Sequence, residues 1–91
     1  MPLDAATKAR LIAEYGGSAT NTGSPAVQVA LLTERIKQVT EHLKKHKKDY
    51  HSRRGLLLMV ARRARLLKYI SQQDIDAYRQ LTDKLGIRQK G

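Results

Sequence analysis

The feature that most constrains this chain is a run of apolar residues spaced alternately three and four positions apart. Its members are Val29, Leu32, Ile36, Val39 and Leu43. This spacing places them in a narrow seam along one side of a helix about 20 residues long, which requires another helix to cover it. Ser24-Pro25 predicts where the helix begins, with the Ser24 hydroxyl as N-cap and proline at the first helical position.

A short helix is expected before this one, over about 5–15. Asp4 can cap its start, and Gly16-Gly17 can end it. Its apolar side consists of Leu11, Ile12 and Tyr15. The segment GGSATNTG (16–23) is predicted to be a turn-rich linker and the most flexible part of the chain.

The basic stretch KKHKKD (44–49) interrupts the apolar spacing and predicts a short loop. Asp49 can cap a third helix running to about 71, with Leu56, Met59, Val60, Leu66, Leu67 and Ile70 on its apolar side. Gln72-Gln73 should connect it to Asp74, the cap of a short fourth helix that Gly86 ends. That helix carries Ile75, Tyr78, Leu81 and Leu85.

The expected fold class is therefore all-α, with four helices. Two long antiparallel central helices stand between a short N-terminal helix and a short C-terminal helix. A length of 91 residues suffices for one small domain, so 1–91 is expected to be a single helical domain.

The charge of the chain is strongly positive and unevenly placed. There are 18 Lys and Arg residues against 8 Asp and Glu, a formal net charge of +10. Between Lys37 and Lys68, 11 basic residues stand against only Glu41 and Asp49. Such self-repulsion is tolerable when a polyanion is the usual neighbour, so nucleic acid is the expected partner, although a merely solvated charged face is the common alternative.

Several classes of function are excluded or disfavoured. Cysteine is absent, which excludes disulfides, thiolate zinc sites and a cysteine nucleophile. No apolar run is long enough for a membrane span and the start lacks the pattern of a signal peptide, so a cytoplasmic protein without a membrane partner is expected. No two carboxylates stand three or four residues apart, and no P-loop or dinucleotide motif occurs, so neither an enzyme nor a cofactor is expected.

The helical spacing places basic and stacking side chains on common faces. Gln28, Arg35 and His42 recur every seven residues beside the apolar seam of the second helix. On the third helix, a face opposite the apolar side consists of Arg54, Leu58, Arg62, Arg65 and Tyr69. Arginines ending at an exposed tyrosine offer phosphate pairing together with a stacking platform, which favours RNA.

The loop also contains acceptors that phosphate binding does not need. The side chains of His42, Asp49 and Ser52 can each accept a hydrogen bond from the amino group of guanine in the minor groove, which is wide and shallow in RNA. The alternative is structural: Asp49 as a helix N-cap, Ser52 in the first turn, and His42 as a surface residue. His42, His46 and His51 lie close in sequence but lie among lysines, and no metal site is expected.

A long segment resembles one known family. The stretch GSPAVQVALLTERIKQVTEHLKKHKKDYHSRRGLLLMVARRARLLKYI (23–70), with HKKDYHSRRGLL as its most specific string, is similar to small-subunit ribosomal protein number fifteen. The similarity extends over essentially the whole chain and matches the bacterial form. It implies a four-helix protein that binds 16S ribosomal RNA in its central domain, early in 30S assembly, and is a monomer when free.

The resemblance also implies two RNA-binding sets. The first reads a G·U/G·C motif in a minor groove through His42, Asp49 and Ser52, with His46 nearby. The basic residues around them are expected to bind RNA as well: Lys47, Lys48, Arg53 and Arg54. The second contacts a three-way junction and comprises Thr22, Gly23, Ser24, Gln28, Arg35, Arg65 and Tyr69. Further implied partners are 23S ribosomal RNA at the subunit interface, other small-subunit proteins and, in some members, the protein's own mRNA.

The chain departs from the family pattern at the end of the third helix. Ala64 and Ser71-Gln72-Gln73 stand where basic residues are usual, and Arg63 falls on the apolar side, from which it should extend to solvent. Two other classes stay open: a DNA-binding helical module, for which the long helices are unsuited, and a coiled-coil interaction protein, which the apolar seam permits.

Overall fold

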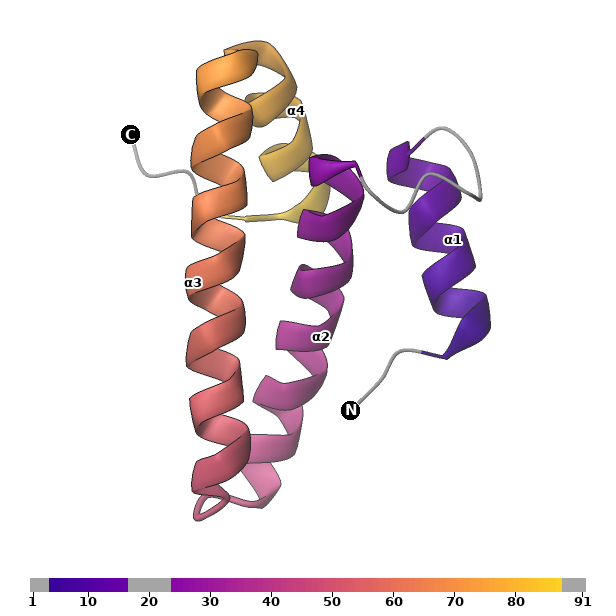
Figure 1. Cartoon of the computed structure of the whole chain (residues 1–91). Coiled ribbons are helices and arrows are strands. Elements are labelled where there is room, and N and C mark those ends of the chain that lie inside the picture. The colour runs from indigo at the N-terminus through magenta and orange to yellow at the C-terminus, as the bar shows by residue number, and fades with distance from the viewer. Residues whose placement is uncertain (1–3, 17–23, 88–91) are drawn as a thin grey trace.

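The computed structural model describes residues 4–16 and 24–87 and forms four helices (Figure 1). They are α1 (Ala5–Gly16), α2 (Pro25–Lys45), α3 (Tyr50–Gln73) and α4 (Ile75–Leu85). Neither described stretch contains a strand. The predicted all-α class, with two long helices between two short ones, is confirmed.

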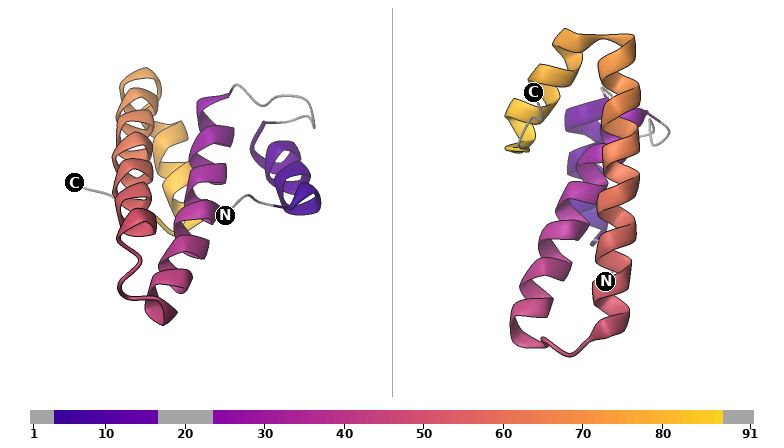
Figure 2. Two further views of the ribbon diagram at one scale, coloured as in Figure 1. Left: turned by 60° about the horizontal axis from the view of Figure 1, so that its bottom comes forward. Right: turned by 90° about the vertical axis from the view of Figure 1, so that its left-hand side faces the viewer.

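The centre of the fold is an antiparallel hairpin of α2 and α3. The two helices lie side by side and are joined by the loop 46–49 at one end (Figure 1). α4 folds back from the far end of α3, and α1 lies against the side of α2 that faces away from α3 (Figures 1 and 2). The loop end of the hairpin therefore projects beyond both short helices.

The core is thickest at the end of the hairpin away from the loop. There Val29 of α2, Leu67 of α3 and Leu81 of α4 form one buried cluster. The seam predicted on α2 holds, since Val29, Leu32 and Val39 are buried and its other members half-buried. Two predicted core residues are wrong: Val60 is 39% exposed and Ile75 is 47% exposed. Each is only partly covered by the described residues around it, because apolar spacing indicates the packed side of a helix but not how far its neighbours extend over it.

α1 is attached through an apolar contact and a polar one. Leu11 and Ile12 are buried, as predicted. At its end, the Lys84 ammonium of α4 lies 4.5 Å from the centre of the Tyr15 ring and 3.6 Å from a carboxylate oxygen of Glu14. The linker predicted at 16–23 lies outside the described residues except for Gly16, which is the last residue of α1.

Most of the predicted helix ends are confirmed. Asp4 Oδ1 accepts from Thr7 N at 2.6 Å, and Asp74 Oδ1 accepts from two backbone N–H groups of α4. Gly86 follows α4 in the left-handed conformation, with φ of 68°.

Two predictions about helix ends are wrong. Ser24 stands at the N-cap position but its hydroxyl makes no capping hydrogen bond. Pro25, which has no N–H to satisfy and a preset φ, begins the helix without it. Gln72-Gln73 is the last turn of α3 rather than a connection, because the Asp74 N–H still donates to the Ile70 carbonyl.

We expect α1 to be the least stable helix of the free protein. A 12-residue helix is marginal by itself, and among its described side chains only Leu11 and Ile12 are buried. Hydrogen exchange should be at least about tenfold faster for amides of α1 than for those of 29–43, and RNA should reduce the difference. Equal protection of the two segments in free protein would contradict this expectation.

Two glycine substitutions should change stability in opposite directions. Gly86→Ala should lower the free energy of unfolding by about 1 kcal/mol, because an alanine at a φ of 68° is strained. Gly55→Ala should raise it by roughly 0.5–1 kcal/mol, since Gly55 lies inside α3. An added Cβ there meets no atom within 4 Å. Urea denaturation of both variants checks the signs, and a destabilised Gly55→Ala would contradict the second.

Candidate nucleic-acid interface

The loop between α2 and α3 is a tight turn held by backbone hydrogen bonds. The His46 N–H donates to the His42 carbonyl at 2.9 Å, and the Asp49 N–H donates to the His46 carbonyl at 3.1 Å. A guanidinium N–H of Arg53 donates to the Lys47 carbonyl at 2.9 Å. Arg53, predicted to contact RNA, therefore also braces the loop from α3. This turn brings the end of α2 against the start of α3.

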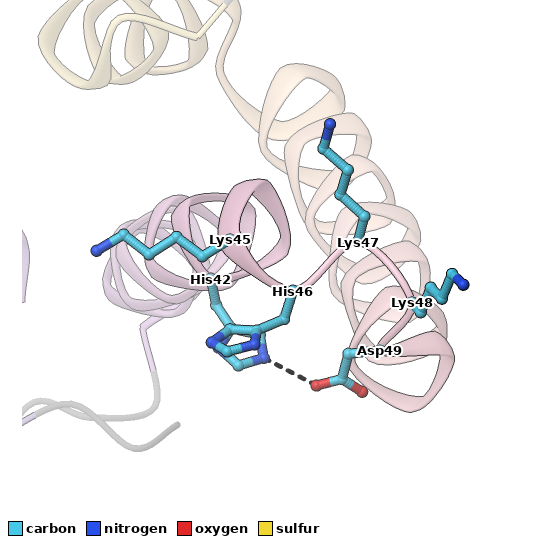
Figure 3. Close-up of a pocket in the computed structure, with 6 residues that line it drawn as sticks. All are labelled: His42, Lys45, His46, Lys47, Lys48 and Asp49. Atoms are coloured by element: carbon cyan, nitrogen blue, oxygen red, sulfur yellow. Dashed lines mark hydrogen bonds and ion pairs between the residues drawn. The ribbon is translucent and has the colours of Figure 1, made fainter.

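Asp49 connects these two helix ends through its carboxylate. Oδ1 accepts from Ser52 N at 3.1 Å, which is the N-cap bond of α3, as predicted. Oδ2 accepts from the Ser52 hydroxyl at 2.7 Å. It also accepts from His42 Nε2 at 2.8 Å (Figure 3). The hydrogen bonds from Ser52 and, next, from His42 hold the pKa of Asp49 well below its usual range. The carboxylate is therefore ionised and can only accept.

The two histidines of this end of α2 stack on each other. The ring centres of His42 and His46 are 4.6 Å apart, with 29° between the ring planes, and both rings project to the side where Asp49 lies (Figure 3). His42 is half-buried and His46 is exposed. The sequence signal for this pair is its spacing of four, which brings the ring of His46, the C-cap residue of α2, to the face of the last turn where His42 lies. We define the histidine–aspartate cluster as His42, His46, Asp49 and Ser52.

Lysines surround the histidine–aspartate cluster and point away from it. Lys45, Lys47 and Lys48 are exposed and extend in different directions from the hollow that the loop lines (Figure 3). Lys44 differs, because its ammonium pairs with Glu41 at 2.9 Å and holds the pKa of Glu41 below its ordinary value. The arrangement puts hydrogen-bonded acceptors at the centre and exposed cations around them.

The faces predicted along the long helices are on the surface. On α3, Leu58 is 63% exposed and Tyr69 is 52% exposed, and the arginines of that face are exposed too. On α2, Arg35 is exposed, while Gln28 and His42 are half-buried. The exposure of Leu57, at 66%, was not predicted. It is one residue from Leu58, and no apolar partner covers it.

The two predicted RNA-binding sets are centred on opposite ends of the hairpin, although Arg35 of the junction set lies at the middle of α2. Ser24 and Tyr69 line one groove at the start of α2, whereas the histidine–aspartate cluster lies at the end of α2. A helix of 21 residues separates these ends by about 30 Å. Thr22 and Gly23, also assigned to the junction set, lie outside the described residues.

Arg63 has a structural partner. It is half-buried between the long helices, and its guanidinium donates to the Thr33 hydroxyl at 3.4 Å. Burial lowers the pKa of Arg63. The prediction that the Arg63 side chain extends from the apolar side to solvent is therefore only partly right, because its guanidinium is hydrogen-bonded to a residue of α2.

The described residues show no arrangement for metal binding or membrane crossing. Nowhere in 4–16 or 24–87 do three or more potential metal-binding side chains of His, Cys, Asp or Glu come together. Within the same ranges, no helix combines the length and the apolar character that a membrane span needs.

Comparison with known proteins gives one consistent result. The family model described as "Ribosomal protein S15" matches residues 8–88. "Small ribosomal subunit protein uS15" of Kineococcus radiotolerans is 59% identical over 88 residues, covering 97% of this chain and 99% of the relative. The proteins of that name from Streptomyces avermitilis and Mycolicibacterium vanbaalenii are each 58% identical; the alignments cover 97% of this chain and 93% and 99% of the relatives. The chain therefore belongs to the ribosomal protein S15 family.

Proposed function

We propose that this chain is a structural, non-enzymatic constituent of the small subunit of the cytoplasmic ribosome, and that it acts by binding 16S ribosomal RNA. Family membership supports the ribosomal assignment. The net charge of +10 supports an RNA partner, because a chain so basic gains most from neutralising phosphates. The whole chain, 1–91, would act as one RNA-binding domain.

The observation that carries the RNA-binding proposal is the histidine–aspartate cluster. Phosphate binding needs only cations, yet the projecting end of the hairpin holds an ionised carboxylate with a hydroxyl and an imidazole each within hydrogen-bond distance of it. Such groups match the amino group that guanine presents in the minor groove of RNA. We infer that this end reads a G·U/G·C motif while the surrounding lysines bind phosphates.

The far end of the hairpin would contact a three-way junction. Ser24 and Tyr69 share a groove there, and Arg65 belongs to the exposed face of α3 that ends at Tyr69. Gln28 and Arg35 continue along α2 toward the cluster. The separation of about 30 Å between the ends would let one protein fix the relative position of two RNA elements, which is a means of assisting 30S assembly. Contacts with 23S RNA, with other small-subunit proteins and with its own mRNA are further proposed roles.

A binding comparison tests this function against the alternatives. A junction RNA carrying the G·U/G·C motif should bind more tightly than the same sequence as DNA and than a scrambled RNA. Equal affinity for RNA and DNA would favour a DNA-binding module, and no affinity for either would favour a protein–protein role. The structure is less suited to either alternative. A DNA-binding module is disfavoured because the loop joins two long antiparallel helices. A coiled-coil interaction protein is disfavoured because the apolar seam of α2 is already covered within the chain.

We expect the affinity for target RNA to depend steeply on salt. With roughly 6–10 phosphate contacts, raising the salt from 50 to 200 mM should lower this affinity about 10³–10⁵-fold, if duplex values apply. Binding releases counterions from the RNA, and the entropy gained by their release decreases as the salt concentration rises. Filter binding or fluorescence anisotropy across that range measures the slope. An affinity almost independent of salt would contradict an interface led by lysine and arginine.

Substitutions in the loop should separate phosphate contacts from base contacts. Lys47→Ala should weaken target and scrambled RNA equally and make the logarithmic salt slope shallower by about one. Ser52→Ala should weaken the target about tenfold and scrambled RNA little, because the hydroxyl is an acceptor for a base. Lys8→Ala, at an exposed position of α1, serves as a control for loss of one charge outside the loop. A uniform loss for Ser52→Ala would contradict base reading.

A further inference from the structure

A groove lies between α3 and α4, which folds back along α3 (Figure 2). It has a volume of about 430 Å³, and most of its lining is apolar. Val60, Ala64 and Leu67 line it from α3, while Tyr78 of α4 and Ile87, just after α4, line it from the other side. None of these residues is among those assigned to RNA above.

The apolar lining continues along α3 toward the loop. Leu57, Val60 and Ala64 recur three and four residues apart, so they follow one another along one face of the helix. All three side chains are exposed. At about 100° per residue, this face lies roughly 130° around α3 from the predicted RNA face that ends at Tyr69. We define the apolar stripe as Leu57, Val60 and Ala64. A row of exposed apolar side chains that leads into a groove is typical of an interaction site.

The charge around the stripe and the groove is positive. α3 contains six arginine and lysine residues and no aspartate or glutamate in its 24 residues. None of the described residues that line the groove is acidic. Lys68 lines it and is exposed, whereas the guanidinium of Arg63, also in the lining, is hydrogen-bonded to Thr33 at 3.4 Å. An occupant that combines apolar with acidic side chains would therefore complement this surface in charge as well as in polarity.

We propose that the apolar stripe and the groove form a docking surface for an acidic amphipathic helix of another protein. Together they extend from Leu57 to Ser71, which is about 21 Å at 1.5 Å per residue and so accommodates about four turns of a bound helix. The apolar face of the bound helix would cover the stripe, with anchors three or four residues apart. Its aspartates and glutamates would lie toward Lys68.

Two other occupants suit this surface less well. A second copy of the chain would bring a net charge of +10 against another of +10, which opposes association. RNA would have to place phosphates or base edges against Val60, Ala64 and Leu67, whose side chains offer neither charge nor hydrogen bonds. Those RNA groups would lose water without gaining partners. The inference does not depend on the proposed RNA binding, because it uses different residues.

Fluorescence anisotropy with a designed peptide tests the proposal on the full-length protein. The probe is a labelled helical peptide of about 16 residues, with leucines along one face and glutamates on the other. The control peptide has the same composition, with the leucines distributed around the helix. Both peptides have the same charge, so general attraction to a basic protein contributes equally. The amphipathic peptide should bind at least about tenfold more tightly. Equal affinity for the two peptides would overturn the proposal.

Substitutions at exposed positions locate the binding site. Ala64→Glu puts a carboxylate beside the groove and should weaken the amphipathic peptide about tenfold, because like charges repel. Ala9→Glu, the same change at an exposed position of α1, should weaken it less than about threefold. Leu57→Gln removes apolar contact without changing the charge and should weaken the peptide about fivefold. Circular dichroism checks that each variant is folded. Equal losses for Ala64→Glu and Ala9→Glu would contradict docking at the groove.

Target RNA distinguishes a protein-binding surface from an RNA-binding one. Leu57→Gln should leave the affinity for junction RNA within about twofold of the parent, since Leu57 lies outside the residues proposed to contact RNA. A variant that loses RNA affinity but keeps full affinity for the peptide would show that the stripe contacts RNA, and the proposal would be wrong. A parent that binds target and scrambled RNA equally would refute the proposed function and leave the peptide result unaffected.

Discussion

The packing of α2 against α3 is the interaction on which the other features depend. The seam of α2 needs a second apolar surface, and α3 supplies it by running back antiparallel from a short loop. The short helices then cover one end of this hairpin, where Val29, Leu67 and Leu81 are buried together. The loop end is left projecting, with a thinner core but a turn held by its own hydrogen bonds. The loop end of the hairpin thus projects because the core lies at the other end.

Positive charge limits how stable such a small hairpin can be by itself. Most of the excess lies from Lys37 to Lys68, which includes the projecting loop, so repulsion is greatest where the core is thinnest. Within the described residues the loop end has few acids to offset it: Glu41 pairs with Lys44, and the Asp49 carboxylate is taken up by the cluster. RNA phosphates would relieve this repulsion, so binding and stability are coupled.

Asp49 has a structural role in the hairpin and is also a proposed RNA contact. The cap bond to Ser52 N stabilises the start of α3, and the bonds to His42 and the Ser52 hydroxyl tie that start to the end of α2. The sequence offered cap and base contact as alternatives. The geometry shows the cap bond, and it shows that most of the carboxylate's acceptor capacity is used within the protein. A substitution at Asp49 therefore has to be judged on folding and on selectivity together.

The sequence alone determined the helices, their order and most of their ends, because periodic apolar spacing and caps such as Asp4, Asp74 and Gly86 act within a few residues. It also placed the basic faces and the His42, Asp49 and Ser52 candidates. Only the tertiary structure decided that Val60 is exposed and that Arg63 ends on Thr33, since both depend on which helix covers which side. The bond between His42 and Asp49 likewise joins residues on different elements, and it exists only because the loop turns the two helix ends together.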